Sequence, residues 1–176
     1  MRVAIICLIL VIIGIIYCYN RLIRGKMQIK NAKSTIDVFL KKRFDLIPNL
    51  IEVVKGYSNY ESDLMVKLTS IRSKYESQSE TKEQLGLDAE YQDSLAIAEN
   101  YPDLKANQTY LELQRQLESL EDELQAARRF YNSAVTKYNI DISVIPLNIF
   151  ANIFKFKEAE LFETTEEEKQ KIKVKI

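Results

Sequence analysis

The first twenty residues constrain this chain more than any other part of it. Arg2 and Arg21 bracket a stretch without a charged side chain, and residues 3–19 form an almost wholly apolar run of seventeen residues. A helix needs roughly 17–25 such residues to cross the hydrocarbon of a bilayer. Tyr17 and Tyr19 lie where an interfacial aromatic belt belongs. The run therefore predicts a single transmembrane helix over residues 3–19.

A cleaved signal peptide is the alternative interpretation of this run. No small-x-small cleavage site follows it, because the apolar residues end in Tyr-Cys-Tyr-Asn-Arg. Cys18 follows Ile-Ile-Tyr, whereas a lipoprotein signal has a small residue before its cysteine. Cys7 and Cys18 both fall inside the span, which favours packed or lipid-facing thiols over redox or metal chemistry. We expect an uncleaved, single-pass anchor in the cell membrane.

Charge is unevenly divided along the chain, although its net value is zero. Residues 20–43 carry eight basic and one acidic side chain, whereas residues 44–176 carry sixteen basic and twenty-four acidic ones. A basic cluster beside a span favours an anionic leaflet and predicts a cytoplasmic body, with the opposite orientation left open. Nucleic-acid binding is disfavoured because the remainder is acidic and no recognition motif is present. The membrane-proximal basic residues are Arg21, Arg24, Lys26, Lys30 and Lys33.

The composition removes most familiar catalytic and cofactor sites. The chain has no histidine, which excludes Ser-His and Cys-His pairs, HExxH zinc sites and a histidine base. Its four glycines are too scattered for a Rossmann turn or a P-loop. The acidic runs at 121–123 and 166–168 are typical of solvated helix faces. We therefore predict no catalytic, cofactor-binding or metal site, and no small-molecule substrate.

The body shows the periodicity of long amphipathic helices. Alternate steps of three and four residues connect apolar positions in three segments, each of which needs the others to bury its face. The predicted fold class is all-α: an N-terminal single transmembrane helix followed by an antiparallel bundle of long amphipathic helices. We divide the chain into the span at 3–19, a basic membrane-proximal helix at 20–44, a bundle at 45–156 and a charged, disordered tail at 163–176. The longest such face, here called the heptad seam, comprises Tyr110, Leu113, Leu117, Leu120, Leu124, Ala127, Tyr131, Ala134 and Tyr138.

Three prolines mark the expected helix boundaries. Pro48 lies either in a first turn capped by Asp45 or at a kink in one continuous helix. Pro102 and Pro146 restrict the residues before them and so mark further boundaries. Residues 73–86 are interpreted as a helix end and loop, and residues 87–100 as a further helix. Residues 147–154 predict a short helix packed across the bundle end, with a stretch lying on the membrane as the alternative.

Several segments resemble the signature blocks of the LemA family, in that family's order. The first block is Lys-Lys-Arg-Phe-Asp-Leu-Ile-Pro-Asn-Leu-Ile-Glu-Val-Val-Lys-Gly-Tyr at 41–57. It is followed by Asn-Tyr-Pro-Asp-Leu-Lys-Ala-Asn at 100–107 and Ala-Arg-Arg-Phe-Tyr-Asn-Ser-Ala-Val at 127–135, with Tyr138-Asn139 beyond. Lys42-Arg43 replaces the family's arginine pair. The resemblance covers residues 19–162, with the whole domain at 20–162, and implies a bacterial-type single-pass membrane protein with a helical bundle but no established reaction or site residues.

Polar residues within these blocks are the candidate site. Asp45 and Asn49 are interpreted as a structural cap and turn beside the basic membrane-proximal helix. The others lie on or beside the heptad seam and have two interpretations: a hydrogen-bond network inside the bundle with Glu52, Glu61 or Asp45, or a surface that recognises a partner. The candidate partner surface or structural network comprises Asp45, Asn49, Arg128, Arg129, Tyr131, Asn132 and Asn139.

These observations favour a non-enzymatic scaffold or adaptor held at the lipid bilayer, with a protein partner or a homo-oligomer as its binding partner. Heptads can be satisfied within one chain or between chains, so the sequence leaves that choice open. A lipid-binding, membrane-organising helical protein is the alternative. An enzyme of unrecognised type is the least favoured hypothesis, because no constellation of side chains supports it.

Overall fold

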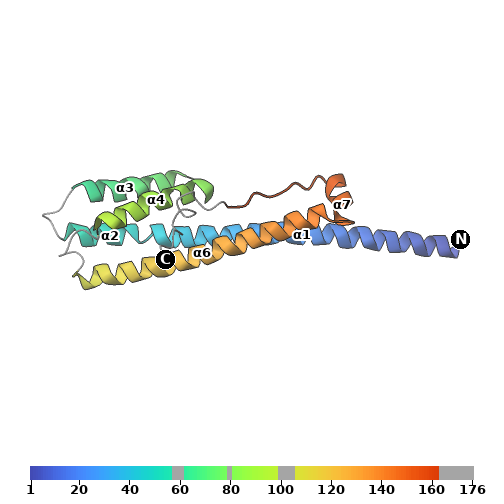
Figure 1. Ribbon diagram of the computed structural model, residues 1–176, viewed down its shortest axis with the longest axis horizontal. Coiled ribbons are helices and arrows are strands. Elements are labelled where there is room, and N and C mark those ends of the chain that lie inside the picture. The colour runs from blue at the N-terminus through green and yellow to red at the C-terminus, as the bar shows by residue number, and fades with distance from the viewer. Residues whose placement is uncertain (57–61, 79–80, 99–105, 163–176) are drawn as a thin grey trace, which may run out of the picture. The chain divides into compact units, whose positions relative to one another are not determined.

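The structure is a computed structural model that describes residues 1–56, 62–78, 81–98 and 106–162. These residues form helices α1 (Arg2–Phe44), α2 (Ile47–Lys55), α3 (Ser62–Ser77), α4 (Thr81–Ala98), α6 (Gln108–Ser143) and α7 (Leu147–Ile153) (Figure 1). No strand occurs within those ranges, and the predicted all-α class is confirmed. The boundary expected at Pro102 and the tail at 163–176 lie outside the described residues.

The chain divides into two compact units, which we describe separately. The first contains Met1–Ala32 and Arg128–Ile176, and the second contains Lys33–Ala127. The division falls inside α1 and α6, so each unit contains part of both long helices.

The second unit has an apolar core built from the predicted faces. On the heptad seam Tyr110, Leu113, Leu117 and Leu124 are buried, which confirms the spacing. Helices α3 and α4 lie side by side (Figure 1). The other buried apolar residues of this unit are Ile36, Leu40, Phe44, Ile47, Leu50, Val54, Leu68, Ile71, Leu87, Tyr91 and Ala127.

One of the basic residues counted beside the span is part of this core. Arg43 is 1% exposed, donates from Nη1 to Glu121 Oε2 at 2.7 Å, and lies over the Tyr91 ring at 4.8 Å from its centroid. Phe44 stacks on Tyr75 beside it, with ring centroids 4.0 Å apart. Arg43 thus differs from the other basic residues counted at 20–43, because its charge is directed inward to an acid and an aromatic face.

The junction near Pro48 also differs from expectation. Helix α1 ends at Phe44, α2 begins at Ile47 with Pro48 in its first turn, and the N-cap residue is Leu46 without a side-chain cap. Asp45 is thus not the cap, and its amide still donates to the Lys41 carbonyl at 2.9 Å. A true side-chain cap occurs at Asn107, whose Oδ1 accepts from the Thr109 and Tyr110 amides at the start of α6.

Helix extends further between residues 73 and 86 than the sequence indicated. Helix α3 continues to Ser77 and α4 begins at Thr81, so Gly86 lies inside α4. Buried Leu87 and Tyr91 lie on this helix. Packing therefore outweighs the weak helical propensity of the polar residues that precede them.

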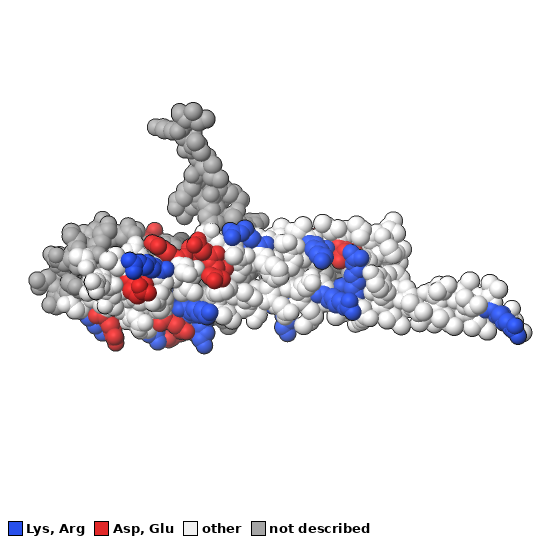
Figure 2. Space-filling model, turned by 90° about the horizontal axis from the view of Figure 1, so that it is seen from below, with Lys and Arg blue, Asp and Glu red and all other residues white. Residues whose placement is uncertain are grey.

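In the first unit, the apolar run of α1 has no partner among the described residues along most of its length. Every large apolar side chain from Val3 to Ile13 is exposed, in a helix that is apolar on all sides. Figure 2 shows this end of α1 as a white projection with a basic residue at its tip. By its length and composition, α1 is the one helix in the described part of the chain that is able to cross a membrane.

The first buried side chain along α1 is that of Cys18. Buried Cys18 and Leu22 of α1 pack against buried Leu147 and Ala151 of α7. The short helix expected after Pro146 is therefore present, and it packs on the side of α1. It ends in a Schellman motif: the Lys155 amide donates to Asn152 O, and the Phe156 amide donates to Ala151 O. Lys155 occupies the left-handed position with φ 57°, which turns the chain back along α6 (Figure 1).

Candidate functional site

The first unit contains a repeated Tyr-Asn dipeptide on one face of α6. Tyr131-Asn132 and Tyr138-Asn139 are one heptad apart, so both pairs point in nearly the same direction from the helix. Tyr131 and Tyr138 are buried and the two asparagines are half-buried. We call these four side chains the Tyr-Asn face.

Each asparagine binds both main-chain groups of one residue in the extended segment 156–162, which we call the strap. Asn139 Nδ2 donates to the Ala159 carbonyl and Asn139 Oδ1 accepts from the Ala159 amide, both at 2.9 Å. Asn132 makes the same two bonds with Phe162, again at 2.9 Å. A carboxamide thus satisfies a peptide unit as a neighbouring strand would, with one donor and one acceptor.

The tyrosines of the face bind the strap between these points. Tyr138 donates its hydroxyl to the Lys157 carbonyl and Tyr131 donates to the Glu160 carbonyl, each at 3.1 Å. Burial raises the pKa of both phenols, and the charge of Glu160 adds to the increase at Tyr131. The Tyr131 ring also contacts the Phe162 ring, with centroids 4.4 Å apart.

The helix and the strap have matching repeats. Seven helical residues rise about 10.5 Å, and three extended residues cover roughly 10 Å. The contacts follow this ratio, since Asn139 to Asn132 is seven residues while Ala159 to Phe162 is three. Along the strap Phe156, Ala159 and Phe162 are half-buried toward the protein, whereas the side chains at 157, 158, 160 and 161 are exposed. The face therefore holds the strap mainly by its main chain.

The structure brings together only part of the residue set proposed from sequence. Tyr131, Asn132 and Asn139 share the Tyr-Asn face, and each forms hydrogen bonds with main-chain groups of the strap. Arg128 is half-buried and Arg129 is exposed on the same helix. Glu61, one of the acids considered as a partner, lies outside the described residues.

Two proposed residues belong to the other unit, where both Asp45 and Asn49 are exposed. The sequence interpretation missed the strap and the role of Tyr138 in holding it. The signal available was the Tyr-Asn pair repeated at a heptad interval, because a polar residue repeated beside a buried seam needs a repeated partner.

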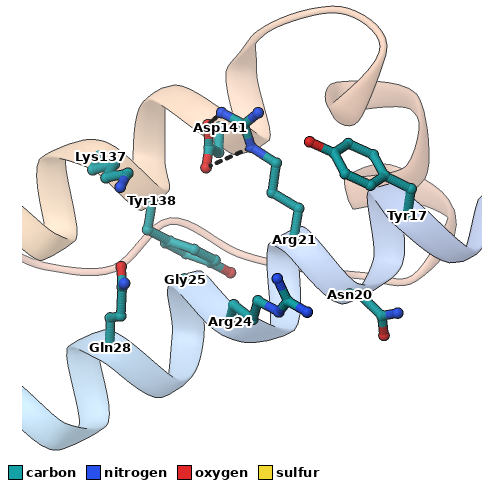
Figure 3. Close-up of a pocket in the computed structure, with 9 residues that line it drawn as sticks. All are labelled: Tyr17, Asn20, Arg21, Arg24, Gly25, Gln28, Lys137, Tyr138 and Asp141. Atoms are coloured by element: carbon teal, nitrogen blue, oxygen red, sulfur yellow. Dashed lines mark hydrogen bonds and ion pairs between the residues drawn. The ribbon is translucent and has the colours of Figure 1, made fainter.

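A polar groove lies beside this face, where α1 emerges from its apolar run (Figure 3). It has a volume of about 420 Å3. Tyr138 lies against Gly25, where a Cβ atom would come within 3.0 Å of the tyrosine Cδ2. The groove is lined on α1 by Tyr17, Asn20, Arg21, Arg24, Gly25 and Gln28, and on α6 by Lys137, Tyr138 and Asp141.

An ion pair closes one end of this groove. Arg21 donates to both oxygens of Asp141, from Nη2 at 2.6 Å and from Nε at 3.2 Å (Figure 3). The Arg21 side chain is 46% exposed and that of Asp141 is 10% exposed. The hydrogen bonds and the charge of Asp141 raise the pKa of Arg21 above its already high value, so the guanidinium stays charged. This fork fixes α1 to α6 within the unit.

The predicted basic residues occupy different environments on α1. Arg21 is paired, and Arg24 lines the groove. Lys26, Lys30 and Lys33 are exposed on the helix surface. Among the residues that the structure describes, no group of three or more His, Cys, Asp or Glu is arranged to hold a metal ion.

Exposed apolar side chains continue from the apolar run of α1 onto α7. Ile145, Ile149 and Ile153 are more than half exposed. Phe154 is also exposed, and its ring lies edge-on to Tyr19 with centroids 5.1 Å apart. The end of the apolar run is thus flanked by a second apolar surface.

The chain is similar to known proteins over most of its length. A sequence model of the LemA family matches residues 32–176. Protein LemA of Metamycoplasma hominis is 31% identical over 162 residues, which cover 85% of this chain and 71% of that protein. The match to the family model includes both the Tyr-Asn face and the strap.

Two magnetosome proteins are also similar to it. Magnetosome protein MamQ 2 of Paramagnetospirillum magneticum is 38% identical over 69 residues, which cover 39% of this chain and 25% of that protein. Magnetosome protein MamQ of Magnetospirillum gryphiswaldense is 21% identical, over 92% of this chain and 71% of that protein.

Proposed function

Because the chain belongs to the LemA family, we propose that it is a membrane-anchored, non-enzymatic scaffold or adaptor that presents its helical body to a protein partner or to further copies of itself. Its anchor is the apolar run of α1, whose large apolar side chains from Val3 to Ile13 are all exposed. Such a surface is stable when lipid covers it.

The observation that carries this proposal is the way the strap is held. The Tyr-Asn face binds main-chain atoms, so the outward side chains Lys157, Glu158 and Leu161 contribute little to holding it. An extended segment fixed in this way presents a defined row of side chains near the base of the anchor. Ordered in advance, this row loses little conformational entropy when a partner binds.

Affinity capture from solubilised membranes tests the adaptor role. The variant Glu158→Lys/Leu161→Ser changes only exposed side chains of the strap and leaves its hydrogen bonds to α6 intact. The control Glu118→Lys/Val66→Ser makes closely similar chemical changes at exposed positions in the other unit. We expect a protein captured with the wild type and the control to be lost with the strap variant.

Two results would count against this role. Capture that is identical for all three chains would exclude the strap as the presented surface. Capture of nothing by the wild type, with the chain intact and in the membrane fraction, would remove the adaptor hypothesis.

A membrane-organising role is the second candidate, and the exposed apolar side chains of α7 favour it. Ile149 and Ile153 adjoin the end of the apolar run and would lie in the interfacial layer of a bilayer. Because the chain has no tryptophan, Ile149→Trp gives a single reporter. We expect brominated lipids to quench the indole of this variant strongly and to leave that of a Val66→Trp control unquenched. Equal quenching of both, or of neither, would contradict insertion of α7.

A further inference from the structure

The polar groove between α1 and α6 has two cations that the described part of the chain leaves unpaired. Arg21 is neutralised by Asp141. Within the described ranges, Arg24 and Lys137 form no ion pair or hydrogen bond, although both line the groove (Figure 3). One cation comes from each helix, and both are solvent-exposed. In Figure 3, Lys137 lies on the Gln28 side of the Tyr138 ring and the Arg24 guanidinium extends toward Asn20. Two exposed cations that line one groove attract an anion.

The position of the groove along α1 indicates where that anion comes from. Arg24 is five residues beyond Tyr19, the last residue of the apolar run, which is about 7.5 Å along a helix. The headgroup layer of each leaflet is roughly 5–8 Å thick, by the difference between the hydrocarbon core and the whole bilayer. If the apolar run spans the membrane, as proposed above, the groove lies among the phosphate groups of the lipids.

We propose that this groove binds the phosphate group of an anionic phospholipid, with Arg24 and Lys137 as its two cations. The guanidinium of Arg24 offers paired donors that match phosphate oxygens, and the ammonium of Lys137 supplies a point charge. Asn20 and Gln28 add neutral donors on the α1 side. The carboxylate of Asp141 does not oppose binding, because Arg21 occupies both of its oxygens.

Lipid is a better source of this phosphate than solution. The groove is open and its cations are exposed, so a single phosphate from bulk water would be held weakly and screened by salt. A headgroup is already concentrated at the surface by the bilayer and loses less translational freedom on binding. The bound lipid would connect α1 to α6. This site therefore differs from the general attraction of the basic membrane-proximal helix at 20–44 for an anionic leaflet.

Lipid retention by the full chain tests the proposal. The chain is reconstituted in vesicles of equal parts phosphatidylglycerol and phosphatidylcholine and extracted in mild detergent, and the phosphatidylglycerol that stays bound is measured by native mass spectrometry. The groove variant is Arg24→Gln/Lys137→Gln. The control is Lys26→Gln/Lys30→Gln, which removes equal charge from exposed positions outside the groove. We expect roughly tenfold less retained lipid with the groove variant and wild-type retention with the control.

The other outcomes overturn the proposal. Equal loss in both variants would mean diffuse electrostatic attraction, and unchanged retention in the groove variant would mean that these cations bind no headgroup. Displacement of the lipid by millimolar inorganic phosphate would assign the groove to free phosphate. Alkaline extraction of the same vesicles checks the anchor separately: a wild-type chain that resists extraction but retains no phosphatidylglycerol refutes the groove site alone, and one that is extracted refutes the membrane anchor and the site together.

Discussion

At the scale of single residues, two asparagine carboxamides hold the strap by making the hydrogen bonds that a neighbouring strand would make. Asn132 and Asn139 each make two hydrogen bonds to a single strap residue, so each can be tested by itself. The tyrosines beside them add one bond each and can titrate. The two residue types therefore give independent tests of the same contact.

Replacing Asn139 with alanine removes both hydrogen bonds to Ala159. We expect a loss of about 1–2 kcal/mol in the unfolding free energy, because the freed main-chain groups regain water only in part. Strap cleavage at Lys157 by trypsin should become faster in the same variant. Thr136→Ala, at an exposed position on α6, is the control and should change neither quantity. An Asn139→Ala chain as stable and as resistant as the wild type would show that the strap is held by other means.

Alkaline pH should release the strap through Tyr131 and Tyr138. Burial raises their pKa values above about 10, so their contribution to stability is complete below the ordinary tyrosine pKa and is lost as pH rises through the raised values. Phenolates can no longer donate to the carbonyls of Lys157 and Glu160. Stability measured by denaturant between pH 8 and pH 11 should therefore fall.

Lysines also lose charge in that range, so the double variant Tyr131→Phe/Tyr138→Phe isolates the tyrosine contribution. It should be less stable at neutral pH and show a shallower decline above about pH 10. A decline as steep as that of the wild type would attribute the pH effect to other groups.

At the scale of elements, helix pairs are joined at a few closely packed points. Gly25 of α1 lets the Tyr138 ring approach the helix backbone, and the same tyrosine binds the strap. In the second unit, Arg43 of α1 is buried against Glu121 of α6. Each point can be disturbed without altering the helices themselves.

Gly25→Ala and Gly86→Ala should have opposite effects on stability. A Cβ at residue 25 would meet Tyr138 Cδ2 at 3.0 Å and push the ring from its position, whereas a Cβ at residue 86 meets nothing within 4 Å. We expect Gly86→Ala to stabilise α4 by about 0.5–1 kcal/mol through helix propensity. Gly25→Ala should lose that gain and loosen the strap. Thermal unfolding of both variants decides the matter, and a stabilising Gly25→Ala would refute the close approach.

Removing the buried guanidinium of Arg43 should destabilise the second unit strongly. Arg43→Ala leaves the Glu121 carboxylate without its partner and empties the space over Tyr91, which we expect to cost about 2–4 kcal/mol. The neighbouring Lys42 is exposed, so Lys42→Ala should stay within about 0.5 kcal/mol of the wild type. Similar unfolding free energies for the two variants, measured with denaturant, would contradict the burial of Arg43.

At the scale of the whole molecule, the sequence predicted those features of the fold that depend on the pattern of apolar and polar side chains. The apolar run and the heptad seam of α6 could be identified because burial and lipid exposure both impose a periodic or continuous apolar signature. The strap could not, because the Tyr-Asn face binds main-chain atoms, which every residue has. The turn between α7 and the strap was not predicted either, because Lys155 occupies a left-handed position at which glycine usually occurs. The burial of Arg43 was also not predicted, because charge alone does not show which basic residue has a buried partner.

Charged substitutions in the apolar run should impair membrane insertion without changing the stability of the helical body. Leu8 and Val11 are exposed and touch no core, so Leu8→Arg/Val11→Arg should leave the unfolding of the body unchanged. Each arginine at the centre of a span costs roughly 2.5–3.5 kcal/mol of insertion free energy, which should move the chain out of the membrane fraction. Leu8→Ala/Val11→Ala is the control and should stay there. A charged variant that remains in the membrane, or that unfolds the body, would contradict the role of this run as an anchor.

The central claim is that α6 holds the strap through its main chain, and amide hydrogen exchange of the full chain measures this directly. The amides of Ala159 and Phe162 donate to Asn139 and Asn132, whereas the exposed side chains between them would suggest an unstructured segment. Exchange at these two amides should be slow in the wild type and should reach the rate of an unstructured peptide in Asn132→Ala/Asn139→Ala. Fast exchange at both amides in the wild type would contradict the account.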